Sequence, residues 1–374
     1  MSLSVGIVGL PNVGKSTLFN ALTKRQQAAA ENYPFCTIEP NSAIVEVADS
    51  RLEALAKIVN PAQIIRATVE FTDIAGLVKG ASKGEGLGNK FLANIRECDA
   101  ILHVVRCFEN DDIIHVQEGG NKSAPIDPAG DAEVIETELV LADMEQLQKR
   151  CDKTRNEAKS DPKKRPEFDA MTALLAHLGE GKPVRTFPRA EGDPILPVLR
   201  DLHFLTDKKT IYCANVAEDD LADPTANPHV QALKAYADAQ GCEMVTICAQ
   251  MEADLAGLSD EEAKEFLGSY GLTEGSLDRT IKLAYHTLGL ASYLTAGPKE
   301  VRAWTFHRGW KAPQCAGVIH TDFEKGFIRA QIIAFDDYIK YNGEAGARAA
   351  GALRPEGKEY EMQDGDVVEF MFNK

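Results

Sequence analysis

One stretch, GLPNVGKST at positions 9–17, constrains this chain more than any other part of its sequence. It follows an apolar run at 5–8 that is typical of a buried strand, and it precedes a pattern at 18–22 that is typical of a starting helix. Glycines at these positions let the loop turn its backbone N–H groups inward, and the following helix adds a positive dipole end. Strand, loop and helix together predict a phosphate-binding P-loop, and with it a Ras-like α/β fold.

The residue types in this loop predict their roles. Lys15 is expected to reach the β- and γ-phosphates and to stabilise transition-state charge, and the Ser16 hydroxyl is expected to ligate Mg²⁺. Asn12 is also a candidate to hold a K⁺ ion. The residues of this loop predicted to contact the nucleotide are Gly9, Asn12, Val13, Gly14, Lys15, Ser16 and Thr17.

Composition argues against several classes of protein. The chain has 374 residues, enough for two or three domains, and its formal net charge of −16 argues against a surface that binds polyanions as a whole. Its 8 cysteines lack C-x-x-C spacing and are expected to be reduced thiols. There is no signal-like N-terminus and no apolar run near the ~20 residues of a membrane span. We therefore expect a cytoplasmic protein without membrane contact.

Two further segments supply candidates for the magnesium site. Residues 31–40 contain two prolines that break regular structure, and Thr37 in this loop is the candidate to close over Mg²⁺ and the γ-phosphate. Residues 67–73 are typical of a strand, and the D-x-x-G that starts at Asp73 is typical of a Walker B acid, which holds Mg²⁺ through water. The N–H of Gly76 is expected to sense the γ-phosphate.

The group that activates water is less evident. Leu77 occupies the position at which Ras-like GTPases carry a glutamine, and an aliphatic side chain cannot orient water. The glycine-rich segment 79–88 is typical of a switch that orders with nucleotide. His115, beyond a buried strand predicted at 100–108, has the chemistry to position or polarise water, although a lone histidine in a loop is more often a plain surface residue.

The residues that would read the base depart from the GTPase pattern. The sequence N-x-x-E from Asn215 to Glu218 replaces N-K-x-D, with Val216 in place of the lysine. Residues 243–250 predict the last strand, and Cys248 and Ala249 within it lie where GTPases carry a Ser-Ala loop that contacts the base. Because adenine offers an amine donor where guanine offers a carbonyl acceptor, the altered motif indicates a shift of specificity towards ATP.

Residues 131–200 predict an α-helical coiled-coil hairpin inserted in a nucleotide-binding domain of residues 1–288. Its two apolar seams consist of Val140, Met144, Leu147 and Cys151 and of Phe168, Met171, Leu175 and Leu178. Basic residues gather near its tip, namely Lys149, Arg150, Lys153, Arg155, Lys159, Lys163, Lys164 and Arg165. This cluster indicates an RNA-contacting arm or, alternatively, an ordinary solvated tip. Residues 289–374 are strand-rich and predict a small α+β domain.

The motifs together give a specific resemblance. With PFCTIEPN at 34–41, DIAGLVKGASKGEGLGN at 73–89 and NVAE at 215–218 added to the P-loop, the chain resembles the YchF/Obg-like ATPase family along nearly its whole length. The tail, including residues 307–330, is similar to that family's TGS domain, which has a ubiquitin-like fold associated with RNA and ribosome contacts.

The resemblance implies properties that the spacing of residues does not. It implies a preference for ATP over GTP, with the hydrophobic Leu77 in place of the catalytic glutamine. It also implies a part for His115 in hydrolysis, Mg²⁺ held by Ser16 and Thr37, and main-chain contact between Val216 and adenine. As partner it implies the ribosome, with the large subunit and rRNA contacted through the hairpin and the TGS domain of a monomeric protein.

The sequence thus predicts a ribosome-associated ATPase with Mg²⁺ that hydrolyses ATP to ADP, binds GTP weakly, and acts as a nucleotide-dependent switch in translation or stress regulation. With no built-in glutamine or evident arginine finger, its intrinsic rate is expected to be low. Two alternatives stay open, namely a true GTPase translation factor and a non-hydrolysing, nucleotide-gated ribosome-binding module.

Overall fold

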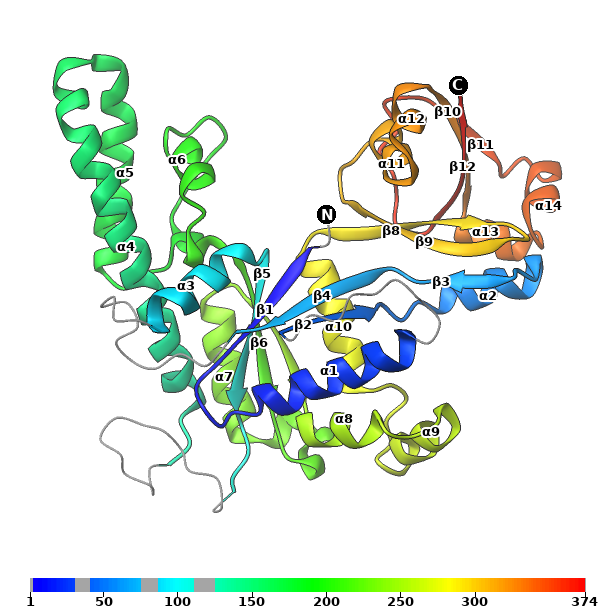
Figure 1. The fold of residues 1–374 in the computed structure, drawn as a ribbon, viewed down its shortest axis with the longest axis horizontal. Helices are drawn as coiled ribbons and strands as arrows, with labels where there is room; N and C mark the ends of the chain where they lie inside the picture. The colour runs from blue at the N-terminus through cyan, green and yellow to red at the C-terminus, as the bar shows by residue number, and fades with distance from the viewer. Residues whose placement is uncertain (1–2, 31–40, 75–86, 111–124, 374) are drawn as a thin grey trace. The chain divides into compact units, whose positions relative to one another are not determined.

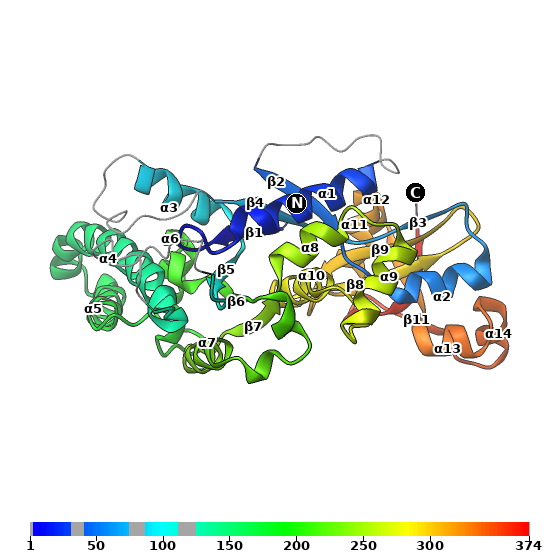
Figure 2. The ribbon, with the colours of Figure 1, turned by 90° about the horizontal axis from the view of Figure 1, so that it is seen from below.

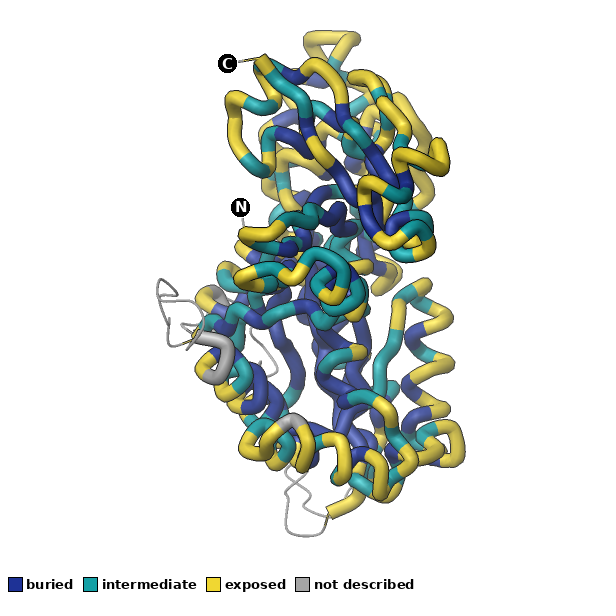
Figure 3. Tube along the Cα trace, turned by 90° about the vertical axis from the view of Figure 1, so that its right-hand side faces the viewer, coloured by how far each residue is buried: buried dark blue, intermediate teal, exposed yellow. Residues whose placement is uncertain are grey.

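The computed structural model describes residues 3–30, 41–74, 87–110 and 125–373. The chain forms two compact units, Met1–Ile44 with Glu70–Thr280 and Val45–Val69 with Ile281–Lys374. Figure 3 shows buried positions concentrated in the strands and exposed positions along the outer faces of the helices. The seven cysteines in the described ranges are free thiols. No helix in this part of the chain combines the length and apolar character that a membrane span requires.

The first unit is built on a six-stranded sheet in the order β2-β4-β1-β5-β6-β7 (Figure 1). The strands are β1 (Ser4–Val8), β2 (Ser42–Glu46), β4 (Thr68–Asp73), β5 (Ala100–Arg106), β6 (Lys209–Asn215) and β7 (Glu243–Ile247). Strand β1 pairs in parallel with β4 and β5, and the parallel pairing continues to β6 and β7. Every residue of β5 is buried, as expected for a central parallel strand. The predicted α/β fold is therefore confirmed.

Helices lie on both sides of this sheet (Figure 2). The helices of this unit are α1 (Lys15–Ala30), α3 (Leu87–Glu97), α4 (Pro128–Ser160), α5 (Arg165–Gly179), α6 (Ile195–Leu202), α7 (Pro228–Ala239), α8 (Ala249–Leu255) and α9 (Asp260–Ser269), and α10 (Ser276–Thr287) begins in this unit and ends in the second. Apolar residues of α3 and α4 pack with β1 and β5 in one cluster, and residues of α7 and α8 pack with β6 in another. The sheet is thus covered as parallel sheets require.

Helices α4 and α5 form a hairpin that projects from the unit, side by side in Figure 1. All eight residues of the two predicted seams lie in one apolar cluster between these helices and the segment at 184–204. Helix α4 begins earlier than the predicted position 131, because Asp127 caps it by accepting from the Gly130 N–H at 3.0 Å. The tip turns at Pro162–Lys164, where a proline prevents α4 from continuing.

A buried carboxylate fixes the base of this hairpin. The side chain of Asp143 on α4 accepts hydrogen bonds from the N–H groups of Leu205 and Thr206 at 2.9 and 2.8 Å, and from the Thr206 hydroxyl at 2.7 Å. These donors favour the ionised carboxylate, but burial outweighs them and raises the pKa of Asp143 from 3.8 to about 6.

The second unit is a mixed sheet in the order β11-β10-β12-β8-β9-β3. Its strands are β3 (Gln63–Ile65), β8 (Leu290–Ala296), β9 (Glu300–His307), β10 (Phe327–Ala334), β11 (Arg354–Glu356) and β12 (Asp366–Phe372). Its helices are α2 (Ser50–Val59), α11 (Ala312–Ile319), α12 (Thr321–Lys325), α13 (Phe335–Lys340) and α14 (Glu344–Ala349). Residues of α11 pack with β8, β9, β10 and β12 around Tyr293, so the tail is α+β as expected.

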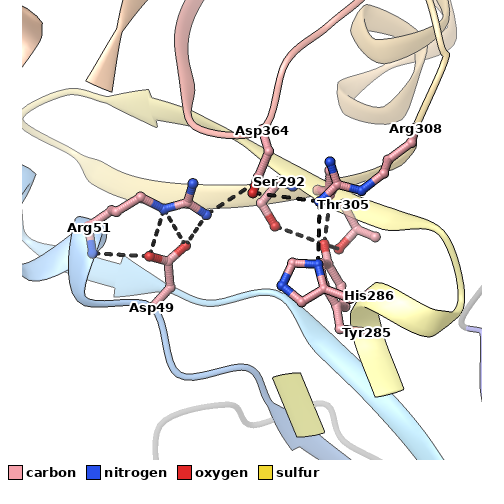
Figure 4. Close-up of polar contacts among 9 residues, drawn as sticks. Asp49, Arg51, Tyr285, His286, Ser292, Thr305, Arg308 and Asp364 are labelled. Carbon is pink, nitrogen blue, oxygen red and sulfur yellow. Dashed lines mark hydrogen bonds and ion pairs between the residues drawn. The ribbon is translucent and has the colours of Figure 1, made fainter. Parts of the chain in front are cut away.

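Residues 45–69 belong to this second unit although they lie far from it in sequence. Strand β3 pairs in parallel with β9, and α2 contacts β8 and β9. Arg51 of α2 donates to Asp49 at 2.8 Å and to Asp364 at 3.3 Å, and Asp364 also accepts from the Ser292 N–H at 3.1 Å (Figure 4). A single boundary at 288/289 therefore does not separate the two compact units.

We predict that the Asp143 carboxyl group makes stability depend on pH. Between about pH 4 and pH 6 the unfolded chain has released this proton and the folded chain keeps it, so stability falls as pH rises, by at most about 1.4 kcal/mol per pH unit. Urea unfolding of the native protein and of Asp143→Asn, compared from about pH 4 to about pH 7, should show their difference changing across this window. A constant difference would contradict the assignment.

We also predict that Leu55→Ala weakens the C-terminal strands. Leu55 on α2 is fully buried, and a truncated core leucine costs about 2–5 kcal/mol. Hydrogen exchange should become faster in β8 and β9 while β5 and β6 keep their protection. Leu258→Ala is the matched control because Leu258 is 41% exposed. Unchanged exchange in β8 and β9 would show that α2 does not support them.

Candidate functional site

The predicted P-loop connects β1 to α1 at the carboxyl edge of the sheet, and its glycines permit close approaches. A Cβ atom on Gly14 would lie 2.2 Å from Nδ2 of Asn215, and Gly14 has φ of +98°. A Cβ atom on Gly9 would lie 2.4 Å from the Val104 carbonyl oxygen. Asn12 has a left-handed φ of 63°, which asparagine tolerates better than most residues. The loop path therefore depends on residue types in the motif.

Lys15, the first residue of α1, is nearly buried. Its Nζ donates to the carbonyl oxygen of Leu10 at 2.6 Å. Burial lowers the pKa of Lys15 to about 8, and the negative charge of Asp73 acts against this shift. Asp73 ends β4 opposite Ile7 of β1, and burial raises its pKa while Lys15 lowers it. Lys15 and Asp73 therefore each shift the pKa of the other at the carboxyl edge of the sheet.

Two of the predicted magnesium ligands lie in the described ranges. The Ser16 side chain follows Lys15 at the start of α1 and is exposed, and Asp73 is partly exposed at the end of β4. Hydroxyl and carboxylate oxygens are the ligand types that Mg²⁺ takes, usually together with phosphate oxygens and water. The donor set therefore fits Mg²⁺ in chemistry. Outside the described residues lie Thr37, Gly76, Leu77 and His115.

Asn215 joins the phosphate loop to the segment after β7. Its Nδ2 donates to the Val13 carbonyl oxygen at 2.9 Å, and its Oδ1 accepts from the Ala249 N–H at 3.0 Å. Both halves of a buried amide are therefore satisfied. The neighbouring Val216 donates its N–H to the Ile247 carbonyl oxygen at 2.9 Å, so only its carbonyl can serve a ligand as a main-chain contact.

The other predicted base-reading residues lie beside this bridge. Glu218 begins a short 3-10 helix, Glu218–Leu221, and is partly exposed. Cys248 is the N-cap residue of α8, and Ala249 is the first residue of that helix. Burial raises the pKa of the Cys248 thiol, so it remains a neutral group at physiological pH.

These residues surround a cavity of about 550 Å³. Its lining contains Asn12, Gly14, Lys15, Ser16, Thr17, Phe108, Glu109, Asn110, Asn215, Val216, Ala217, Glu218, Cys248, Ala249 and Gln250. The structure thus brings the P-loop, the altered N-x-x-E motif and the segment after β7 to one space. Gly9 and Val13 lie outside the lining, where Gly9 allows a close backbone approach and Val13 supplies the carbonyl that Asn215 binds. Asp73 is also outside the lining.

Sequence reasoning missed one wall of this cavity. The lining residues that were not predicted to contact a ligand are Phe108, Glu109, Asn110, Ala217 and Gln250. The first three directly follow β5, and the carboxyl ends of parallel strands share one edge of the sheet. Their position after a buried central strand was therefore an available signal, as it was for Asp73.

Comparison with known proteins gives this site a family. A family model described as 50S ribosome-binding GTPase matches residues 4–137. The chain is 52% identical over 376 residues to the ribosome-binding ATPase YchF of Bacillus subtilis (strain 168), covering 100% of both. This chain belongs to the YchF family. The model YchF-GTPase_C, described as a protein of unknown function, matches residues 290–373 of this family member.

Further relatives agree with this membership. The ribosome-binding ATPase YchF of Escherichia coli O157:H7 is 52% identical over 374 residues, again covering 100% of both chains. A solved structure of the Schizosaccharomyces pombe YchF GTPase matches with a TM-score of 0.86 and 36% identity, over 99% of this chain and 98% of that one. The resemblance to the YchF family that the motifs gave is therefore confirmed.

We predict that Asn215→Asp disrupts the cavity. A carboxylate still accepts from Ala249 but cannot donate to Val13, where it would place one oxygen against another. Nucleotide affinity should fall by about tenfold or more, since about 1.4 kcal/mol corresponds to a factor of ten. Asn156→Asp, on the exposed side of the hairpin, is the matched control. Equal affinities of both variants would show that the bridge does not support the cavity.

Proposed function

We propose that this chain is a cytoplasmic, Mg²⁺-dependent P-loop ATPase that binds and slowly hydrolyses ATP to ADP. The observation that carries this proposal is the shared cavity of the Lys15 phosphate loop and the altered base motif at Asn215 to Glu218. Relatives at 52% identity over the full length carry the name ribosome-binding ATPase, which supports the same activity.

The main chain of Val216 favours ATP over GTP. Its N–H is engaged by Ile247, so its carbonyl, an acceptor, is the group offered to a base. A carbonyl attracts the exocyclic amine of adenine and repels the carbonyl oxygen that guanine presents at the same position. GTP should therefore bind weakly.

Hydrolysis would rest on groups at the phosphate end. Lys15 and the N-terminus of α1 would stabilise the charge that develops on the γ-phosphate. Ser16, Thr37 and Asp73 would hold Mg²⁺, which when bound neutralises charge on the β- and γ-phosphate oxygens. His115 would position the attacking water, since Leu77 cannot, and the Gly76 N–H would contact the γ-phosphate. Asn12 would contribute to a K⁺ site.

The partner we propose is the large ribosomal subunit, contacted by a monomer through rRNA. The hairpin, which we infer to be a coiled-coil arm within residues 131–200, would supply basic side chains, and residues 289–374 would act as a TGS domain. Several tip residues pair with nearby acids: Lys149 with Glu145, Arg150 and Lys164 with Glu167, Arg155 with Asp152, and Arg165 with Asp169. Exposed pairs of this kind are worth at most about 1 kcal/mol, so phosphates can replace the acids.

Such a protein would act as a nucleotide-dependent switch in translation or stress regulation. Its intrinsic rate would be low because neither a glutamine nor an arginine finger is evident in the sequence, and ribosomes would raise it. A hydrolysis rate that is the same in K⁺ and Na⁺ would contradict the proposed K⁺ site at Asn12.

The test is equilibrium binding of fluorescent ATP and GTP analogues with Mg²⁺, followed by turnover with and without ribosomes. We expect ATP to bind more tightly than GTP and to be hydrolysed slowly to ADP at a rate that ribosomes raise. Lys15→Ala should abolish turnover. Tighter GTP binding would support the GTPase translation factor instead. ATP binding without turnover, even with ribosomes, would support the nucleotide-gated module that does not hydrolyse.

A further inference from the structure

The cavity wall at Phe108, Glu109 and Asn110 has no regular secondary structure, yet side chains hold it at several points. It directly follows Cys107, whose N–H donates to the Asn215 carbonyl oxygen at 2.8 Å. Because loops of this kind are usually fixed by caps and side chains, the groups that hold this wall decide how well the cavity is preformed.

Arg106 makes the most extensive of these contacts. It is the last residue of β5 and is 3% exposed. Its Nε donates to the Phe108 carbonyl oxygen and its Nη2 to the Asn110 carbonyl oxygen, both at 3.0 Å. Its guanidinium carbon also lies 4.9 Å from the centroid of the Phe108 ring. One planar group therefore fixes two carbonyls and one ring of the wall.

Asn227 holds Cys107, the residue that directly precedes the wall. Its Nδ2 donates to the Cys107 carbonyl oxygen at 3.0 Å and to Asp220 at 2.9 Å. Its Oδ1 accepts from the N–H groups of His229 and Val230, which caps α7. Asn227 thus joins the residue before the wall to the segment that follows β6.

We propose that Arg106 is a positioning residue for the nucleobase end of the cavity, with Asn227 as its support. The wall that they fix shares the cavity with Val216 and Glu218, the residues expected to meet a base. Neither side chain lines the cavity, and each acts through the backbone and ring of residues that do. This inference rests on the proposed function, because it assumes that the cavity binds a nucleotide.

The two ends of a bound nucleotide would meet different parts of the cavity. The phosphates would bind the P-loop, whereas Arg106 donates to the Phe108 and Asn110 carbonyl oxygens of the wall. A defect in the wall should therefore weaken the binding of a nucleotide without weakening the binding of its phosphate chain alone. A general loss of folding would instead weaken both.

The experiment measures the affinities of Mg²⁺-ATP and of Mg²⁺-tripolyphosphate for the full chain by calorimetry. Arg106→Lys keeps the charge but cannot present two forked N–H groups to two carbonyls. We expect its affinity for ATP to fall about tenfold and its affinity for tripolyphosphate to change less than about twofold. Arg185→Lys is the control, a partly buried arginine of the same unit that pairs with Glu136 and does not line the cavity.

A second variant keeps the test decisive where Arg106→Lys folds poorly. Asn227→Asp retains the oxygen that caps α7 but loses the donor to Cys107, and we expect the same selective loss. Equal losses for ATP and tripolyphosphate, or no loss for either, would overturn the proposal while leaving the ATPase assignment in place. Failure of the native protein to bind either ligand would instead overturn the proposed function.

Discussion

The amide of Asn215 is the interaction on which the rest of the cavity depends. It joins the Val13 carbonyl of the phosphate loop to the Ala249 N–H at the start of α8. Its neighbour Gly14 must lack a side chain, because a Cβ atom there would lie 2.2 Å from this amide. Phosphate binding and base recognition therefore share a support, and neither loop can shift without breaking a buried hydrogen bond.

The route of the chain between the two predicted magnesium ligands has a second consequence. Between Thr37 and Asp73 the chain passes through residues 45–69, which fold as part of the C-terminal unit. Arg51 and Leu55 in this segment are held by the second unit through ion pairs and by burial. The nucleotide-binding edge and the C-terminal sheet are therefore connected twice through the backbone by short strands, β2 and β4. Strain at the proposed magnesium site would therefore have a covalent path to the second unit.

The sequence predicted those parts of the cavity in which particular residue types form a motif. Residues of the P-loop line one cavity with Asn215 and Val216, and the sequence indicated them because a phosphate and a base each require particular atoms at particular spacings. The roles of Arg106 and Asn227 were not predictable, because they bind carbonyl groups that every residue has, and no motif records such contacts. Likewise, the place of residues 45–69 follows from the pairing of β3 with β9, a long-range contact that local patterns do not encode.

At the base end of the cavity, some carbonyl groups are bound by side chains that hold the wall, and another, that of Val216, can face a ligand. Two N–H groups of Arg106 and one of Asn227 bind carbonyls in the wall or next to it, so these three donors are not available to a ligand. At Val216 the N–H is occupied and the carbonyl is the group that a base can meet. A carbonyl acceptor at this point favours a base with an exposed amine. Selectivity for adenine would thus follow from the carbonyl that Val216 leaves available, as well as from the replacement of lysine by Val216.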